Sequence, residues 1–166
     1  GLNLRVVIRR PNEALFLKTA GRTGQIELVQ GNIRDEASSR AALQGASAVI
    51  NAVGILYETG PQKFDAVQSA GAARVATLAA EQGLDRFIQI SAIGADTGSA
   101  SAYARSKAEG EAAILAACPQ AHVLRPSIVV GPEDDFFNRF ARMAQIAPAL
   151  PLVGGGLTRY QPVGVF

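Results

Sequence analysis

Short apolar runs alternate along the chain with segments that carry helix signals, and this alternation constrains the fold more than any other feature. The runs are rich in β-branched residues, which is typical of strands with helices packed on both sheet faces. They are Leu4–Ile8, Ile26–Gln30, Ala48–Gly54, Arg86–Ser91 and Ala121–Arg125. Strands that alternate with helices in this way favour parallel connections. The sequence therefore predicts an α/β fold with a doubly wound parallel sheet.

Helix signals occupy the segments between these runs. Proline suits a first turn, so a helix is predicted over Pro11–Ala20. Asp35 is a typical N-cap of a short helix that Gly45 closes. A long alanine-rich helix is predicted over Phe64–Gln82, and another from about Ser101. These helices supply the crossovers that a parallel sheet requires.

No internal repeat or domain boundary is visible, so we expect residues 1–166 to form one domain. Hydrophobic residues make up 48% and charged residues 18% of the chain, which is typical of a well-packed globular protein. A last helix is expected over Phe136–Met143, where the aromatic residues indicate a core or interdomain contact.

The charge pattern and the cysteine and histidine content exclude several classes of function. The net charge is only +2, and the arginines are scattered rather than gathered in a stripe, which argues against nucleic acid as a partner. The single cysteine, Cys118, indicates a reducing compartment. The single histidine, His122, has no second histidine or acidic cluster with metal-ligand spacing, so no metal is expected. We also expect no membrane span, because no apolar run approaches about 20 residues.

Tyr103 and Lys107 form the pattern that carries most of the chemistry. Because they lie four residues apart on a predicted helix, their side chains project from one face. The ammonium can then lower the pKa of the phenol and hold a ribose, while the phenol passes a proton to a carbonyl or carbinol. Alternatively, Lys107 only makes an i,i+4 ion pair with Glu111 on a solvated face. Arg105 and Glu109 have the same spacing.

Residues at the carboxyl ends of the predicted strands are candidates for ligand contacts, because open α/β sheets bind ligands there. Arg9 and Arg10 follow the first run, where arginine suits a phosphate. Ala52, Val53 and Gly54 end the third run, and small residues let a backbone approach a ligand closely. The alternatives are solvated arginines that close a strand and a glycine that merely ends one.

Several motifs in this order resemble the NADPH-binding accessory subunits of respiratory complex I and their bacterial relatives. These proteins form an atypical branch of the extended short-chain dehydrogenase/reductase family, whose fold is Rossmann-like and related to NAD-dependent epimerases and dehydratases. The motifs are Asn51–Thr59, Arg86–Ser91, Tyr103–Glu111, Arg125–Asp135 and Gln161–Val163. The resemblance covers essentially the whole chain.

The resemblance implies a bound dinucleotide. NADP(H) is expected in preference to NAD(H), because arginines rather than an acidic residue follow the first run. The implied contacts are Arg9 and Arg10 at the 2′-phosphate, Asn32 and Ile33 at the adenine, Ala52, Val53 and Gly54 where the backbone approaches the ligand, Tyr103 and Lys107 at the nicotinamide ribose, and Pro126 and Ser127 at the nicotinamide.

Three functions are compatible with this resemblance. The first is a complex I accessory or assembly subunit that holds NADP(H) as a structural element and has respiratory complex I subunits as partners. The second is an active NAD(P)-dependent oxidoreductase or epimerase, in which Tyr103 is the acid/base, Lys107 lowers its pKa and Ser91 orients the substrate. Ala92 stands where active relatives often carry a second hydroxyl. The third is a redox-sensing regulator of the NmrA-like kind.

The resemblance also bears on the ends of the chain and on the location of the protein. The family's first strand and its Gly-x-x-Gly-x-x-Gly turn would precede Gly1, and a C-terminal lobe would follow Phe166. We therefore expect the intact protein to be longer at both ends. We expect it in the cytoplasm, or peripherally on the cytoplasmic or matrix side of the respiratory membrane.

Overall fold

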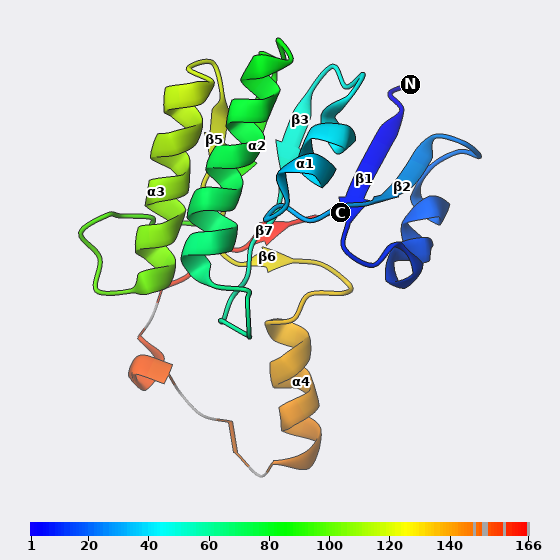
Figure 1. Cartoon of the computed structure of the whole chain (residues 1–166). Coiled ribbons are helices and arrows are strands. Elements are labelled where there is room, and N and C mark those ends of the chain that lie inside the picture. Colours follow the sequence, from blue (N-terminus) through cyan, green and yellow to red (C-terminus); the bar gives the residue numbers. More distant parts are fainter. Residues whose placement is uncertain (148, 151–152, 158, 166) are drawn as a thin grey trace. The chain divides into compact units, whose positions relative to one another are not determined.

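The computed structural model describes residues 1–147, 149–150, 153–157 and 159–165. It consists of two compact units, Gly1–Leu124 and Arg125–Phe166, which are described separately below (Figure 1).

The first unit contains two parallel sheets. Strand β1 (Leu4–Ile8) pairs with β2 (Ile26–Gln30). Strand β3 (Val49–Asn51) pairs with β4 (Phe87–Ile90), which pairs in turn with β5 (His122–Leu124). All five predicted strands therefore form, and every pairing among them is parallel. The predicted α/β class with a parallel sheet is confirmed.

Helical segments connect these strands. A 3₁₀ helix, η1 (Pro11–Ala20), lies between β1 and β2, and Ala14 within it has non-helical backbone angles. Helix α1 (Glu36–Leu43) connects β2 to β3. A π-helical segment, η2 (Asp65–Ser69), leads into α2 (Ala70–Glu81), and α3 (Ala102–Ala117) follows β4. The predicted helices are thus present, but the first is a 3₁₀ helix and the third begins with a π turn.

Side-chain caps fix the start of two of these helices. The Asp35 carboxylate accepts a hydrogen bond from the Ser38 backbone N–H at 2.6 Å, as the sequence predicted. The Ser101 hydroxyl accepts one from the Ala104 backbone N–H at the start of α3. Gly83, just beyond α2, has a φ of +72°, which only glycine adopts without strain.

The core of this unit lies between α2, α3 and the β3–β5 sheet. Phe87 of β4 and Ile114 of α3 are its largest fully buried side chains. The buried cluster consists of Leu43, Val49, Ala72, Ala76, Leu78, Ala79, Phe87, Ile114 and Cys118. Because most of the α2 members are alanines, that helix packs closely against its neighbours.

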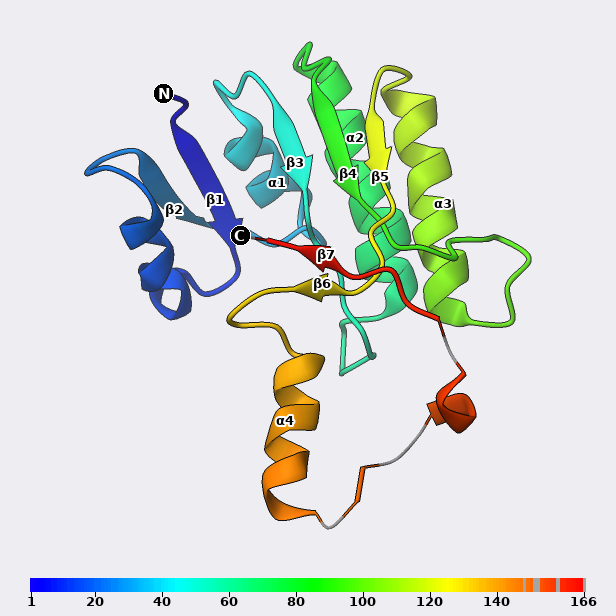
Figure 2. The ribbon, with the colours of Figure 1, turned by 180° about the vertical axis from the view of Figure 1, so that it is seen from behind.

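The opposite face of the three-stranded sheet is apolar and exposed. Figures 1 and 2 show α2 and α3 on the same face of the sheet. On the other face the strand register aligns Ile50 with Ile88, and Ile90 with Leu124. Ile50 is 62% exposed.

The second unit contains a short parallel pair, β6 (Val129–Val130) with β7 (Val163–Gly164). It also contains α4 (Phe137–Ile146) and the 3₁₀ turn η3 (Val153–Gly156). The predicted aromatic contact lies within this unit, where the Phe136 ring packs against the rings of its neighbours. Those rings are Phe137, Phe140 and Tyr160, at centroid distances of 5.2, 5.2 and 5.7 Å.

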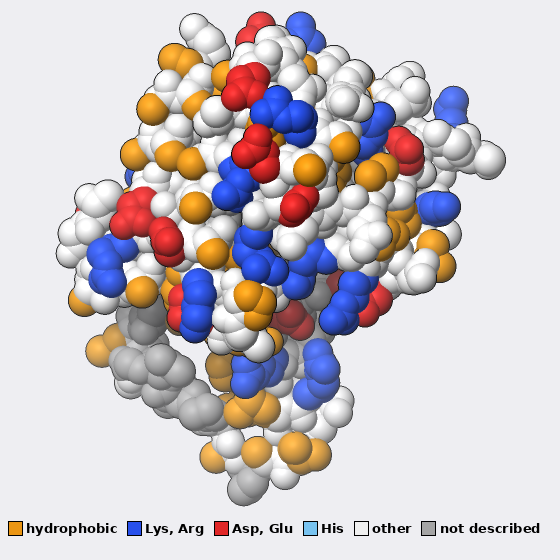
Figure 3. Space-filling model, in the orientation of Figure 1, with side chains coloured by type: hydrophobic (Ala, Val, Ile, Leu, Met, Phe, Trp, Pro, Cys, Tyr) orange, Lys and Arg blue, Asp and Glu red, His pale blue; other side chains and the backbone are white. Residues whose placement is uncertain are grey.

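Charged side chains of both signs are interspersed over the helices of the first unit (Figure 3). Arg40, for example, pairs with both Glu36 and Glu81. Within the described part of the chain, no helix is long and apolar enough to cross a membrane. No group of acidic, cysteine and histidine side chains suited to a metal occurs among the same residues.

Replacing Gly110 of α3 by alanine should destabilise the protein. A Cβ built on Gly110 would overlap the backbone carbonyl oxygen of Gln68 in η2. An alanine in an open helix position is about 1 kcal/mol better than glycine. At Gly110 the crowding outweighs this gain in helix propensity. We therefore expect Gly110→Ala to lower the free energy of unfolding by about 1 to 3 kcal/mol. Urea denaturation of the intact protein measures the change.

The exposed neighbour Glu109 provides the control for this experiment. Glu109→Ala lies on the same helix and should change stability by no more than about 0.5 kcal/mol. Stabilisation by Gly110→Ala would contradict the close approach of α3 to η2.

Candidate functional site

Tyr103 and Lys107 lie on one face of the first turns of α3, as their spacing predicted. The Lys107 ammonium lies over the tyrosine ring, 5.9 Å from its centroid. The edge of that ring packs against Phe64, which precedes η2, with centroids 5.7 Å apart. The helix and the segment before α2 thus fix the phenol from two sides.

The lysine is buried rather than solvated. Lys107 is 7% exposed and Glu111, one turn further along, is 4% exposed. Burial lowers the pKa of Lys107, and the negative charge of Glu111 opposes that shift. The alternative of an ion pair on a solvated face is therefore wrong for Lys107. Arg105 instead donates to the carbonyls of Ser99 and Ala100 in the loop before α3.

Gly54, after β3, lies directly against the lysine. A Cβ built on Gly54 would lie 3.0 Å from Lys107 Nζ and 3.4 Å from Gln68 Oε1. Such distances are tighter than ordinary contacts, so a side chain here would displace the ammonium. Gly54 does not have a positive φ, so close approach rather than turn geometry explains the glycine. Whether Gly54 also lets the backbone approach a ligand stays a prediction.

Ser91 follows β4 and is 5% exposed. Its backbone N–H donates to the Leu124 carbonyl, at 2.7 Å. Its Oγ has no hydrogen-bond partner among the described residues. A buried hydroxyl without a partner is costly, and such groups are frequent at sites that bind a ligand.

Burial raises the pKa of the Tyr103 phenol. The sequence-based expectation was that Lys107 lowers this pKa, but the net shift is in the opposite direction. The physical reason is that the half-buried phenol loses hydration, which disfavours the phenolate. The ammonium lies over the face of the tyrosine ring, 5.9 Å from its centroid. The phenol is therefore a hydrogen-bond donor at neutral pH.

Buried amide side chains connect these elements, and the sequence analysis did not single them out. Asn51 Nδ2 donates to Gln89 Oε1 at 2.8 Å, which joins β3 to β4. Gln68 Nε2 donates to Ser106 Oγ at 3.0 Å, which joins η2 to α3. A usable signal was present for Gln68, because it lies four residues before Ala72 in an otherwise apolar helical stripe.

The arginines expected at a 2′-phosphate follow β1, at its carboxyl end. Arg9 is exposed, and Arg10 pairs with Glu13 at 2.9 Å within the first turn of η1. Side-chain hydrogen bonds hold the turn after β2. Asn32 Oδ1 accepts from the Arg34 backbone N–H, while the Ile33 carbonyl accepts from a guanidinium of α2.

The remaining residues that were predicted to contact the ligand lie in two parts of the chain. Ala52 and Val53 are exposed after β3, with the Val53 N–H bonded to Asn51 Oδ1. Pro126 and Ser127 belong to the second unit, where Ser127 Oγ accepts from the Gln161 backbone N–H. The ligand-binding roles of these residues stay predictions.

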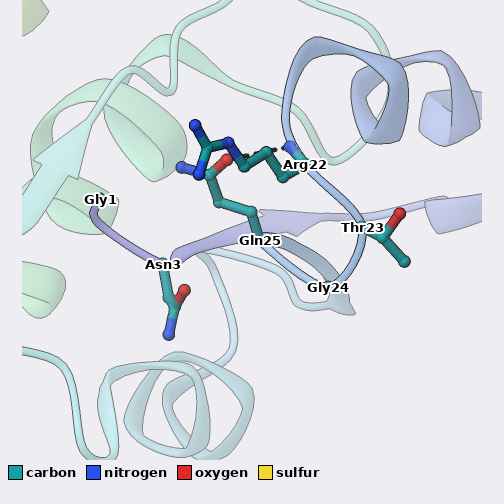
Figure 4. Close-up of a pocket in the computed structure, with 6 residues that line it drawn as sticks. All are labelled: Gly1, Asn3, Arg22, Thr23, Gly24 and Gln25. Carbon is teal, nitrogen blue, oxygen red and sulfur yellow. Dashed lines mark hydrogen bonds between the residues drawn. The ribbon is translucent and has the colours of Figure 1, made fainter.

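A hollow of about 480 Å³ lies at the other end of the strands (Figure 4). Its lining includes Asn3, just before β1, and Arg22 and Gln25, just before β2. The Arg22 backbone N–H donates to Gln25 Oε1 there. Because open α/β sheets bind ligands at the carboxyl ends of their strands, this hollow is not the candidate site.

The strands of this parallel sheet end beside Tyr103, Lys107 and Gly54. Such an arrangement defines an α/β protein of the nucleotide-binding class. The family described as NAD(P)H-binding matches residues 1–128. The chain belongs to this family, and the sequence-based resemblance is confirmed at that level.

Named relatives and a solved structure agree with this assignment. Over 150 residues the chain is 39% identical to NADH dehydrogenase (ubiquinone) 1 alpha subcomplex subunit 9, mitochondrial, of Arabidopsis thaliana, covering 90% of this chain and 37% of that protein. It is 31% identical to a ceramide reductase of Caulobacter vibrioides, covering 92% of this chain and 47% of that protein. The chain thus spans less than half the length of either relative.

The fold is also that of a dTDP-glucose 4,6-dehydratase from Streptomyces venezuelae. The TM-score is 0.75 at 18% identity, covering 98% of this chain and 58% of that structure. This similarity confirms the Rossmann-like fold.

The raised pKa of Tyr103 gives a testable pH dependence. An unburied tyrosine titrates at about 10, and Tyr103 of the nucleotide-free protein should titrate above that value. The contribution of the protonated Tyr103 phenol to the free energy of unfolding is fully present below about pH 10. It is lost as the pH rises through the folded-state pKa, because the unfolded chain releases the phenol proton at a lower pH than the folded chain does. The ultraviolet absorbance of phenolate, as a difference between wild type and Tyr103→Phe, measures this titration. A midpoint at or below that of free tyrosine would contradict the burial.

Proposed function

We propose that this protein binds NADP(H) at the carboxyl ends of β1 to β4. The observation that carries the proposal is the buried Lys107 ammonium, which lies over the Tyr103 ring and beside Gly54. A lysine donates three hydrogen bonds and a phenol donates one, which suits the two hydroxyls of a nicotinamide ribose. Because Gly54 has no side chain, the ammonium can lie close to the carboxyl end of β3.

We further propose that the nucleotide is a structural element of a respiratory complex I accessory or assembly subunit. The support is the 39% identity to the Arabidopsis subunit, whose name places it in NADH dehydrogenase of mitochondria. Ala92 next to Ser91 also fits a nucleotide that is held rather than turned over, because the usual second hydroxyl is replaced by a methyl group. On this proposal the protein associates with complex I subunits at the respiratory membrane.

The second candidate is an active NAD(P)-dependent reductase. It is favoured by the 31% identity to a protein named ceramide reductase and by the buried Ser91 hydroxyl, which has no partner among the described residues. In this role Ser91 Oγ donates to a substrate carbonyl, and Tyr103 supplies the proton that the reduced oxygen requires. Lys107 holds the ribose in both functions.

Preference for NADP(H) is tested by replacing Arg9 and Arg10 together with alanine. Loss of two charge-assisted contacts to the 2′-phosphate should weaken NADPH binding by about 1 to 3 kcal/mol and leave NADH binding nearly unchanged. Isothermal titration calorimetry of the intact protein measures both affinities. An equal loss for the two nucleotides would exclude the phosphate role.

Two single variants serve as controls for this experiment. Arg22→Ala removes an arginine at the opposite end of the strands and should leave both affinities unchanged. Glu13→Gln removes the carboxylate that pairs with Arg10, so it should strengthen NADPH binding while NADH binding stays the same.

The two candidate functions differ in what Tyr103→Phe does. If the protein is a reductase, this variant should abolish turnover and retain nucleotide binding, because only the proton donor is lost. If the nucleotide is structural, wild type and variant should both lack turnover and should co-purify with complex I subunits and bound nucleotide. Mass spectrometry of released nucleotide, with a reductase assay on both proteins, separates the two. Equal turnover in the wild type and in Tyr103→Phe would show that Tyr103 is not a catalytic residue.

A further inference from the structure

The π-helical segment η2 turns one buried amide, Gln68, toward the candidate site. A π turn adds one residue to a helical turn, and such turns are rare and frequent at functional sites. Gln68 lies within Asp65–Ser69 and is 3% exposed. Its side chain is therefore committed to internal partners.

The amide bridges two elements that carry candidate site residues. Gln68 Oε1 accepts from the Ile55 backbone N–H at 3.4 Å, in the turn that contains Gly54. Gln68 Nε2 donates to Ser106 Oγ at 3.0 Å, and that hydroxyl donates to the Tyr103 carbonyl at 2.9 Å. An unbroken hydrogen-bonded path thus runs from the Gly54 turn to the first turns of α3.

The orientation of the amide follows from the chemistry of its partners. A backbone N–H only donates, so the oxygen of Gln68 must face Ile55. The Ser106 hydroxyl gives its proton to the Tyr103 carbonyl and is left to accept from Nε2. Neither a carboxylate nor an apolar side chain of the same size makes this donor and acceptor pair.

The backbone of the same residue sets the helix spacing. The Gln68 carbonyl oxygen faces Gly110 so closely that a Cβ there would overlap it. Side chain and backbone of Gln68 therefore fix the approach of α3 to η2 at two points. Gln68 Oε1 and Lys107 Nζ both lie within 3.4 Å of the position that a Cβ on Gly54 would occupy, so the amide and the ammonium border the same glycine.

We infer that Gln68 is a positioning residue for the nicotinamide half of the nucleotide. Its amide holds the Gly54 turn at a set distance from the face of α3 that carries Tyr103 and Lys107. The inference rests on the proposed function, since it requires that this face binds the nucleotide. Gln68 contacts the Gly54 turn and α3 rather than the adenosine-side residues after β1 and β2, so its loss acts on one half of the ligand.

The test compares two probes in the intact protein: NADPH, and adenosine 2′,5′-bisphosphate, which lacks the nicotinamide half. Gln68→Met keeps the size of the side chain and removes both hydrogen bonds. We expect NADPH affinity to fall by about threefold to tenfold, with the affinity for the bisphosphate unchanged. The fluorescence of bound NADPH should also change, because it reports the surroundings of the nicotinamide.

Two further variants complete the design. Gln82→Met removes an amide that donates to the Arg40 carbonyl at the far end of α2, and it should alter neither affinity. If Gln68→Met does not fold, Ser106→Ala removes the acceptor of Nε2 with a smaller change in volume. It should reproduce the selective loss of NADPH affinity.

The possible results separate the two proposals. A selective loss of NADPH affinity supports the positioning role. Equal loss of both probes, or loss of neither, overturns that role while the proposed nucleotide binding stands. A wild-type protein that binds neither probe overturns the proposed function, and the role of Gln68 with it.

Discussion

The close approach of α3 to the segment before α2 is the constraint on which the candidate site depends. Gly110 lets α3 lie against the backbone of Gln68. The small alanine side chains of α2 let the neighbouring turns of α3 pack closely as well. A bulkier residue at this contact would push α3 away from the carboxyl ends of β3 and β4. Tyr103 and Lys107 would move with it, because both lie on the first turns of that helix. The packing of the core therefore also determines the geometry of the site.

The site contains polar groups whose burial is costly. Lys107 is buried with a lowered pKa, and the negative charge of Glu111 opposes that shift. The Ser91 hydroxyl has no partner among the described residues, although it is nearly inaccessible. A chain selected for stability alone would replace such groups, because an unsatisfied buried polar atom is expensive. Their presence beside a closely approached glycine is typical of a site that is completed by a ligand.

Local signals predicted most of the fold, and packing decided what they could not. Strand periods, the Asp35 cap and the Ser101 cap are encoded within a few residues, so the elements and several of their ends were predictable. The π turn that contains Gln68 has no local sequence signature. The burial of Lys107 and Glu111 was missed for a related reason. Their i,i+4 spacing is the same on a solvated and on a buried face, and only the neighbouring helix distinguishes the two.

The protonation of Tyr103 bears on whether this site only holds a nucleotide or also transfers protons. A phenol whose pKa is raised by burial keeps its proton at neutral pH, so it can donate to an oxygen but is a poor base. Donation alone is enough to hold a ribose and also suffices for the reductive direction of carbonyl chemistry. The oxidative direction requires a phenolate, which an ammonium over the ring face does little to stabilise. With the ammonium over the ring, the site is therefore suited to binding or to reduction, and abstraction of a proton from a carbinol would require the lysine to move toward the phenol oxygen.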